Sequence, residues 1–397
     1  MMLGVLLARA GVPVVVVEKH GDFLRDFRGD TVHPSTLQVL HDLGALEDLL
    51  ARPHEELREV RGEIGGQTVH VGDFTHLPTD VKFMALMPQW DFLDVLQGVG
   101  RRYPGFDLRM EAEVTGLLRD ADGRVSGVEA KTPGGPLRVE ADLVVGADGR
   151  TSTVRDLAGF RADDLGAPMD VLWMRLPRHA DDPEAPLGAF NAGSIFVMLP
   201  RTGYYQCGYV IPKGEADAVR ARGLDAFRQS VARAAPVLAD RTDALASWDD
   251  VKTLTVTVDR LRRWAAPGVL CIGDAAHAMS PIAGVGINLA IQDAVAAANL
   301  LWEPLAEGTL HIADLDRVQA RRQWPVSVIQ RVQLFLQDHV VAPALDGEAW
   351  DRPPLPARLL NRFPVLRRLP ARLIGIGVRM ERVRSPNTHP SPTPALS

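Results

Sequence analysis

The sequence has little of several features that would assign it to a specialised class of protein. Its 397 residues include two cysteines, Cys207 and Cys271, and only 6% of the residues are aromatic. The two cysteines lie far apart in apolar, strand-like runs, which is a poor basis for a disulfide framework and indicates a reducing compartment. No stretch approaches the roughly 20 uninterrupted apolar residues of a membrane-spanning helix. We therefore expect a soluble, cytoplasmic protein.

A secretion signal and an excess of basic residues are also missing. Arg9, Gly11 and Pro13 interrupt the apolar start, and no small-residue cleavage pattern follows it. Lys and Arg number 44 against 50 Asp and Glu, which gives a formal net charge of -6. Nucleic-acid binders usually carry a basic face, so no nucleic acid is expected as a partner. What is present is 46% hydrophobic residues, enough for a sizeable core in two or three domains or one composite unit.

The first segment reads as the second half of a βαβ unit whose first strand is not in the sequence. Residues 3–10 read as the end of a helix that Gly11 closes, and residues 13–17 read as a buried strand ending at Glu18. A continuous valine run is typical of a parallel strand covered on both faces. Further helices are predicted from about Pro34 to Gly44 and over residues 90–101.

The middle of the chain alternates between two kinds of strand. Short runs at 113–118, 125–131 and 137–139 are separated by turn residues, which predicts an antiparallel meander leading to an apolar strand at 142–146. Residues 171–258 show alternating runs typical of an antiparallel sheet. A parallel type of strand returns at 269–272, and an alanine-rich helix follows over 287–301.

These patterns predict an α/β protein with a discontinuous, Rossmann-like cofactor domain that lacks its first strand. The cofactor domain comprises residues 1–165 and 259–340, and an antiparallel-sheet substrate domain is inserted at 166–258. A C-terminal helical region spans 341–384. The proline-rich end, 385–397, shows no periodicity and is expected to be disordered.

Two positions carry the chemistry of a dinucleotide site. Glu18 ends a strand where such folds place an acidic residue for the adenosine ribose, although a solvated charge beside Lys19 explains it equally well.

In the segment 273–288, GDAAHAMSPIAGVGIN, Asp274 follows a parallel strand and can accept a hydrogen bond from a sugar or ribityl hydroxyl. Gly284 and Gly286 open a helix whose free N–H groups can face the negative edge of a reduced flavin. His277 is interpreted as a supporting residue of this loop without a catalytic role.

The segment 273–288 resembles the second FAD fingerprint of the p-hydroxybenzoate hydroxylase family of flavoprotein monooxygenases. Asp148-Gly149, within VVGADGRTSTVR, resembles that family's Asp-Gly motif, and the order of the motifs matches from residue 3 to about 301. The Asp-Gly pair also fits a plain type I′ turn. The resemblance implies the following cofactor-binding residues: Glu18, Lys19, Arg28, Gln89, Val114, Asp148, Gly149, Asp274, Pro281, Gly284, Val285, Gly286, Ile287 and Asn288.

One family motif is absent. The Gly-x-Gly-x-x-Gly loop should precede the helix already running at Leu3, and a stretch on the order of 15 residues is missing. Two explanations are open: the start was assigned at an internal methionine, which we favour because the other motifs are intact, or the product is degenerate and holds FAD poorly. An in-frame extension upstream of Met1 that restores a strand and glycines is expected to yield a yellow protein.

The resemblance implies an enzyme that uses FAD, NAD(P)H and O₂ to hydroxylate an aromatic or polyketide-like small molecule. The residues Phe196, Met198, Tyr205 and Tyr209 would form part of the substrate wall, although an ordinary sheet core explains them equally well. One alternative keeps FAD and changes the reaction to epoxidation, halogenation or reduction of a lipophilic isoprenoid. Another is a truncated, non-catalytic relative that binds FAD poorly or acts as a flavin-free binding protein.

The C-terminal helical region combines arginines with apolar residues. From Arg358 to Arg379 it could lie on an anionic membrane as an amphipathic helix, or pack on the domains with its arginines outward, which is the simpler reading. A homodimer is a further expectation for the assembly.

Overall fold

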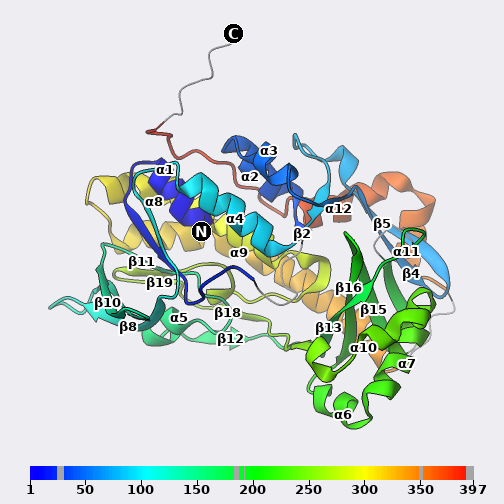
Figure 1. Cartoon of the computed structure of the whole chain (residues 1–397). Coiled ribbons are helices and arrows are strands. Elements are labelled where there is room, and N and C mark those ends of the chain that lie inside the picture. Colours follow the sequence, from blue (N-terminus) through cyan, green and yellow to red (C-terminus); the bar gives the residue numbers. More distant parts are fainter. Residues whose placement is uncertain (25–30, 183–186, 192, 348–351, 390–397) are drawn as a thin grey trace.

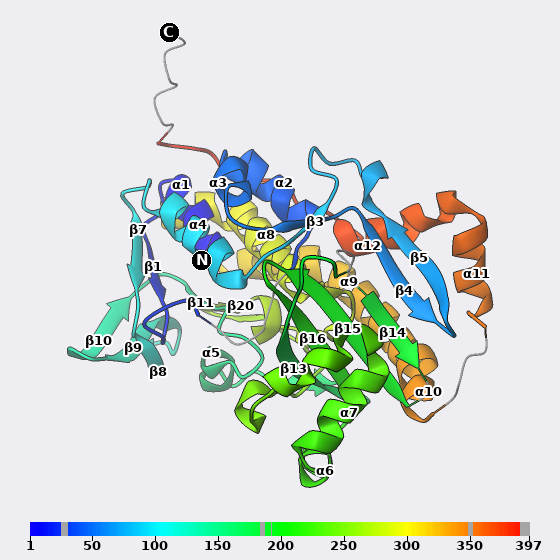
Figure 2. The ribbon, with the colours of Figure 1, turned by 45° about the vertical axis from the view of Figure 1, so that its right-hand side comes forward.

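The computed structural model describes residues 1–24, 31–182, 187–191, 193–347 and 352–389, and three parts lie side by side in it (Figure 1). An α/β part contains both the start of the chain and its long helices, and a mainly antiparallel sheet with its own helices forms the opposite end. The helices near the C-terminus lie against the sheet part at its outer edge (Figure 2). This arrangement agrees with the predicted α/β class, with sheets and helices in separate parts.

The first helix and strand form as predicted, but the strand is less buried than expected. Helix α1 (Met2–Arg9) ends at Gly11, whose φ of 83° suits glycine, and strand β1 (Val14–Val17) pairs in parallel with β7 (Phe106–Arg109). The valine run was expected to be covered on both faces, whereas Val15 is 41% exposed. Helix α1 lies against the face that carries Val16, and Val15 points to the other face.

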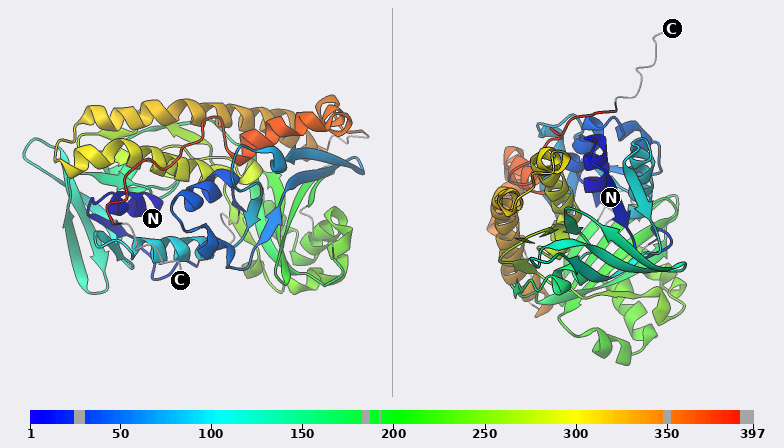
Figure 3. Two further views of the ribbon diagram at one scale, coloured as in Figure 1. Left: turned by 90° about the horizontal axis from the view of Figure 1, so that it is seen from above. Right: turned by 90° about the vertical axis from the view of Figure 1, so that its left-hand side faces the viewer.

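A second parallel pair in the α/β part is followed by the two aspartates predicted from the sequence, Asp148 and Asp274. Strand β11 (Val144–Gly146) pairs in parallel with β20 (Val269–Cys271), and β19 (Ala265–Ala266) pairs with β20 in the antiparallel sense. Among the described residues the parallel sheet is therefore in two pieces, β1–β7 and β11–β20–β19. Helix α8 (Gly286–Ala306) follows β20, and α9 (Ile312–Leu336) runs beside it along the molecule (Figure 3).

The remaining elements of the α/β part support this pair of strands. The predicted antiparallel meander is confirmed, with the strand order β10–β9–β8. Gly44, with a φ of 66°, follows the helix predicted from Pro34. The bounds are β2 (Thr31–Val32), α2 (Pro34–Asp42), α3 (Leu46–Leu50), β3 (Glu55–Leu57), β6 (Met84–Leu86), α4 (Gln89–Gly100), β8 (Glu113–Arg119), β9 (Val125–Thr132), β10 (Gly135–Glu140), α5 (Thr153–Leu157), β12 (Ala162–Asp164) and β18 (Asp259–Leu261).

The second sheet has seven strands in the order β17–β13–β16–β15–β14–β4–β5. Five of these strands, β13 to β17, come from the segment predicted as a separate antiparallel domain. Strands β4 and β5 come from residues that the sequence assigned to the cofactor domain. That assignment is corrected here, because β4 pairs in parallel with β14 through Ala189 and Glu63. The bounds are β4 (Glu59–Ile64), β5 (Gln67–Asp73), β13 (Met169–Pro177), β14 (Leu187–Asn191), β15 (Ser194–Arg201), β16 (Tyr204–Pro212) and β17 (Lys252–Leu254).

The two faces of this sheet have different neighbours. One face packs under α6 (Ala216–Ala221) and α7 (Leu224–Ala234), and the other contacts α9 and α10 (Ala342–Leu345). The four residues proposed as a substrate wall lie on the α7 face, where they form a core with Phe227, so that proposal is wrong: Phe196, Met198, Tyr205 and Tyr209. Alternation along a strand places their neighbours on the opposite face.

The end of the chain is helical and then extended. Helices α11 (Leu355–Arg362) and α12 (Arg368–Gly375), with a 3₁₀ turn between them, pack on strand β5. Residues 385–397 were expected to be disordered, but the described part, 385–389, is held in place. The backbone N–H of Thr388 donates to the Arg9 carbonyl at 3.0 Å, and that of Ser385 donates to the Asn299 side chain. The composition of this segment could not predict its ordered path, because its hydrogen bonds are made to α1 and α8, which are distant in the sequence.

Two exclusions from the sequence can be compared with the structure. Cys207 and Cys271 are both free and buried, in agreement with the expected lack of disulfides. Residues 282–306 are long and apolar enough to cross a membrane by length and composition, but 67% of their apolar window is buried inside the protein. This burial is typical of the central helix of a globular domain.

Candidate active site

Two acidic residues follow neighbouring parallel strands and therefore meet at one edge. Asp148 comes after β11 and Asp274 after β20, and these strands pair in parallel from Val144 with Val269 to Gly146 with Cys271. Arg150 joins the two turns, because its guanidinium lies 3.6 Å from the Asp274 carboxylate and donates to the carbonyl of Thr255 at 3.1 Å. The carboxyl ends of parallel strands are where open α/β sheets bind ligands.

Asp148 is committed to its own turn. Its carboxylate accepts hydrogen bonds from the Ser152 hydroxyl and from the backbone N–H of Val154 at 3.0 Å, which fixes the start of α5. Gly149 has a φ of 88°, a conformation that L side chains rarely adopt. Asp148 and Gly149 therefore shape the edge.

Asp274 faces the start of α8. A Cβ added to Gly286 would lie 3.8 Å from the Asp274 Oδ1 atom and 3.7 Å from Met279, which are ordinary contact distances. Gly286 does not have a positive φ, so neither packing within the protein nor backbone geometry requires glycine here. No side chain caps the first N–H groups of α8. At this edge the Asp274 carboxylate can accept hydrogen bonds, Gly286 leaves the backbone uncovered, and the first N–H groups of α8 are available as donors.

The loop before α8 has an unusual backbone. Ala283 and Gly284 both have a φ of 62°, and for alanine this conformation is strained. A Cβ at Gly284 would come within 2.7 Å of the Thr31 hydroxyl, so glycine is required there by packing as well. His33 lies beneath the loop, with Nε2 3.0 Å from the Gly284 carbonyl and Nδ1 2.8 Å from the Ile374 carbonyl of α12. Burial lowers the pKa of His33 from 6.5 to about 4, so the ring is neutral at physiological pH.

A row of glutamines on α9 holds the same loop from the other side. Gln330 donates to the Ala278 carbonyl at 3.1 Å, and Gln333 donates to the carbonyls of Ser280 and Ile282 at 3.0 and 3.1 Å. One helical turn further, Gln337 donates to the Ser280 hydroxyl. These glutamines are buried, and each satisfies backbone or hydroxyl groups that would otherwise lack partners. Sequence reasoning missed them, although polar residues spaced three or four apart on a helix are a detectable signal.

A buried ion network anchors the turn after β20. The Asp293 carboxylate accepts from His277 Nε2 at 2.6 Å, from Arg322 Nε at 2.8 Å and from the Gly273 N–H at 3.0 Å. Burial alone would raise the pKa of Asp293, but His277 and Arg322 hold it below its usual range. His277 thus supports the loop, in agreement with its interpretation from the sequence. Asp293 and Arg322 were missed, although a charge inside an alanine-rich helix was visible.

The other predicted residues are distributed around this edge. Glu18 and Lys19 follow β1 in the separate two-stranded sheet, where the Glu18 carboxylate accepts from the His20 N–H at 2.9 Å. Val114 lies on β8 and packs toward the cluster that includes Val144 and Val154. The structure brings together Asp274 and the 281–287 loop, and it leaves Glu18 outside this group. The prediction for Arg28 lies outside the described residues.

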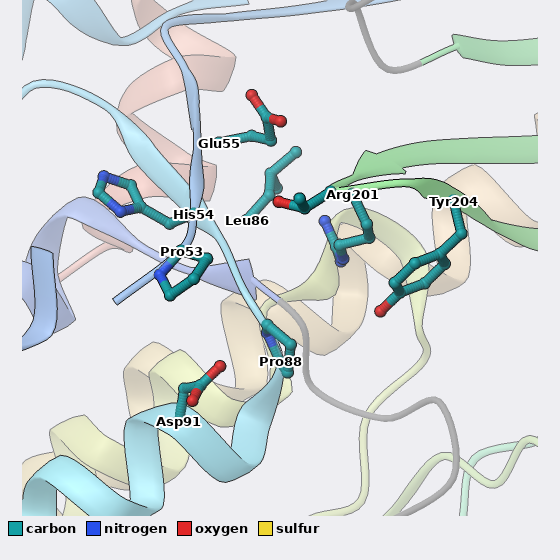
Figure 4. Close-up of a pocket in the computed structure, with 9 residues that line it drawn as sticks. Pro53, His54, Glu55, Leu86, Pro88, Asp91, Arg201 and Tyr204 are labelled. Carbon is teal, nitrogen blue, oxygen red and sulfur yellow. The ribbon is translucent and has the colours of Figure 1, made fainter. Parts of the chain in front are cut away.

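Gln89 and Asn288 are placed differently from each other. Gln89 is the first residue of α4. The residue before it, Pro88, lines a cavity of about 80 Å³ together with Arg201 and Tyr204 (Figure 4). This volume holds a few water molecules and is far smaller than a typical ligand pocket. The Asn288 side chain is buried, and its oxygen accepts from Ser35 and Thr36. Asn288 therefore ties α8 to α2.

These features fit an FAD ring better than they fit a purely structural loop. Gly286 leaves space that a Cβ would fill, the N-terminus of α8 offers uncapped donors, and Asp274 is 29% exposed at the same place. A helix N-terminus stabilises negative charge of the kind a reduced isoalloxazine carries. The fold and this edge define the class of flavin-dependent oxidoreductases built on a dinucleotide-binding sheet.

The chain belongs to the family described as FAD binding domain, whose model matches residues 1–329. A 6-methylpretetramide 4-monooxygenase of Streptomyces rimosus is 37% identical over 388 residues, which cover 96% of this chain and 91% of that protein. A 12-dehydrotetracycline 5-monooxygenase/anhydrotetracycline 6-monooxygenase of the same species is 30% identical over 81% of the chain, and the match spans 64% of its own length. These relatives confirm the predicted FAD-dependent monooxygenase.

Solved structures agree with this assignment. The OxyS anhydrotetracycline hydroxylase of Streptomyces rimosus superposes with a TM-score of 0.71 at 25% identity, covering 94% of this chain and 73% of that one. The p-nitrophenol 4-monooxygenase PnpA of Pseudomonas putida has a TM-score of 0.73 at 21% identity, with 95% of each chain covered. The second likeness shows the shared fold.

Proposed function

We propose that this protein hydroxylates a polycyclic aromatic small molecule with FAD, NAD(P)H and O₂. The observation that carries the proposal is the edge formed by Asp274, the strained 281–285 loop and the bare start of α8. The similarity to monooxygenases of tetracycline intermediates supports a polyketide substrate. When bound, FAD supplies the chemistry, because it takes electrons from NAD(P)H and activates O₂.

The residues of this chain position the flavin and shield it. Asp274 would accept a hydrogen bond from a ribityl hydroxyl, and the N–H groups of Gly286, Ile287 and Asn288 would face the pyrimidine edge of the ring. Pro281, Gly284 and Val285 would keep the loop close to the ring plane. Gln89 at the start of α4 and Arg28 would contact the rest of the cofactor, with Glu18, Lys19, Val114, Asp148 and Gly149 toward its adenosine half. The glutamines and the Asp293 network keep the loop fixed, which preorganises the site.

The substrate wall is assigned to the sheet face opposite α7. Trp173 and Phe190 lie on that face and pack in the same apolar cluster as Ile282 of the flavin loop. The Trp173 indole nitrogen is buried without a hydrogen-bond partner in the described structure, and a ligand oxygen could accept from it. Arg175 lies over the rings of Trp90 and Tyr204, at 6.0 and 5.0 Å from their centroids. A flat aromatic ring fits between such apolar and aromatic side chains.

The test is NADH and NADPH oxidation by the FAD-loaded protein with a panel of polycyclic phenols. A phenolic substrate is expected to stimulate oxidation, and the product is expected to carry one oxygen atom from isotopically labelled O₂. No stimulation across the panel, with FAD demonstrably bound, contradicts hydroxylation. A halide requirement supports halogenation instead, and a product without added oxygen supports reduction. An epoxide, which also gains one oxygen atom from O₂, supports epoxidation.

Location and assembly are also proposals. A cytoplasmic location agrees with two free, buried cysteines. A homodimer would cover Trp324 and Phe335, which are each 59% exposed and, three helical turns apart, lie on one side of α9.

A further inference from the structure

The helical corner formed by α11, the 364–367 turn and α12 exposes several of its large apolar residues to solvent. Three small residues on its inward face are buried: Ala357, Ala371 and Gly375. A Cβ at Gly72 of β5 would come within 3.3 Å of the Ala371 backbone, and one at Gly375 would lie 2.8 Å from Leu77. Small residues therefore let the corner pack closely against β5 and Leu77. Of its large side chains, Leu373 and Ile374 also pack against the neighbouring apolar clusters.

The outward face is apolar. Ten large hydrophobic residues are exposed in the described structure, and five of them lie within the corner: Leu355, Leu359, Phe363, Val365 and Leu369, with exposed fractions of 41% to 69%. In α11 they recur every four residues, so they form one row along the helix. Single exposed apolar residues are ordinary, but a cluster of this kind marks an interaction surface.

The same face is strongly basic. Residues 352–380 contain seven arginines and no aspartate, glutamate or lysine, in a protein whose formal net charge is -6. Arg358, Arg362 and Arg372 are exposed and form no ion pair within the described part of the chain. Arg362 lies over the Phe363 ring, 5.8 Å from its centroid, so that charged and apolar groups alternate on the surface.

The corner is held rigidly, so the surface is already formed. The Asn361 side chain accepts from the His70 N–H at 2.9 Å and donates to the Thr68 carbonyl at 2.8 Å, which attaches α11 to strand β5. Arg367 donates to the carbonyls of Leu360 and Asn361 and joins the turn to α11. Figure 2 shows α11 at the outer edge of the molecule, beside β4 and β5, and α12 nearer the α/β part.

We propose that this corner docks on an anionic lipid bilayer. Leucine, valine and phenylalanine side chains would enter the interface while the arginines contact lipid phosphates, as in amphipathic helices that lie in the membrane plane. A second copy of this chain is a poor partner for the corner. A symmetric contact would place the arginine clusters of the two chains against each other, and like charges repel. This inference does not depend on the proposed reaction.

The surface is connected to the flavin loop by one side chain. His33 contacts the carbonyl of Ile374 in α12 and the carbonyl of Gly284 in the loop. Docking would therefore place the flavin edge near a membrane that can hold a lipophilic substrate.

The test is flotation of the full-length protein with vesicles of phosphatidylcholine alone or with about 30% phosphatidylglycerol. The protein is expected to float only with the anionic vesicles, and salt is expected to release it. Arg358→Gln combined with Arg362→Gln should weaken binding roughly thirty-fold. Leu359→Ser combined with Leu369→Ser should also release the protein, because it removes the inserted apolar groups. Both pairs are exposed, so the fold is expected to persist, and circular dichroism checks it.

The matched control is Arg101→Gln combined with Arg222→Gln, which makes the same change in charge at exposed positions outside the corner. The control is expected to float like the parent protein. Failure to float with anionic vesicles overturns the proposal, and so does flotation that both corner variants retain. Association into dimers that the corner variants abolish, measured by sedimentation without lipid, would assign the surface to a second copy and also overturn it.

Discussion

His33 provides a prediction that can be worked out quantitatively. The ring is buried between the Gly284 and Ile374 carbonyls, and burial lowers its pKa from 6.5 to about 4. Between these two pH values the unfolded chain binds more protons than the folded one, so stability falls as the pH decreases from 6.5 toward 4. One pKa unit corresponds to 1.36 kcal/mol, which gives a loss of about 2 kcal/mol on going from about pH 7.5 to about pH 5.

The perturbation is His33→Gln, which keeps a donor near the position of Nε2 and cannot titrate. The free energy of unfolding is measured by urea denaturation at both pH values for parent and variant. At the higher pH the neutral ring donates to only one of the two carbonyls, so the variant, which keeps one donor, is expected to change in stability by no more than about 1 kcal/mol. The parent is expected to lose about 2 kcal/mol more than the variant on acidification. Equal losses in the two proteins would refute the assignment of a neutral, buried His33.

Three further predictions concern the loop and its support. Asp293→Asn is expected to lower the free energy of unfolding by about 3–5 kcal/mol, because Arg322 and His277 lose a charged partner, and urea denaturation that shows no change would contradict this. Ala283→Gly should raise stability by about 0.5–1 kcal/mol by relieving the positive φ, measured in the same assay with Ala290→Gly, inside α8, as a destabilised comparison. Cys271, whose pKa burial raises to about 12, should resist thiol reagents until denaturant is added, and rapid labelling of the native protein would argue against its burial.

The sequence predicted the elements whose patterns are local. Gly11 and Gly44 end their helices at positive φ, and the short turns of the meander separate β8, β9 and β10 as expected. The 273–288 segment pointed to the candidate site, because glycines, a strand-end aspartate and a helix start coincide within sixteen residues. The prediction of the family followed from the order of the motifs, and it is confirmed.

The parts that were missed depend on contacts distant in sequence. Strand β4 joins β14, more than a hundred residues later, so its periodicity could not reveal which sheet it enters. The α7 face and the opposite face of the second sheet are both apolar, and alternation cannot say which of them faces the flavin edge. For the same reason Arg322 and the glutamines of α9 gave no sign of their partners, which lie thirty to seventy residues away along the chain.

The most direct test of the flavin edge is FAD affinity after Gly286→Ala, measured by the quenching of flavin fluorescence. The added methyl group meets only ordinary contacts within the protein, and alanine is favoured in a helix, so the free protein should keep or gain about 0.5–1 kcal/mol of stability. Gly98→Ala, at an open position in α4, is the matched control. The account predicts that Gly286→Ala loses FAD affinity while Gly98→Ala keeps it. Equal FAD affinity in both variants would contradict the placement of the flavin at the start of α8.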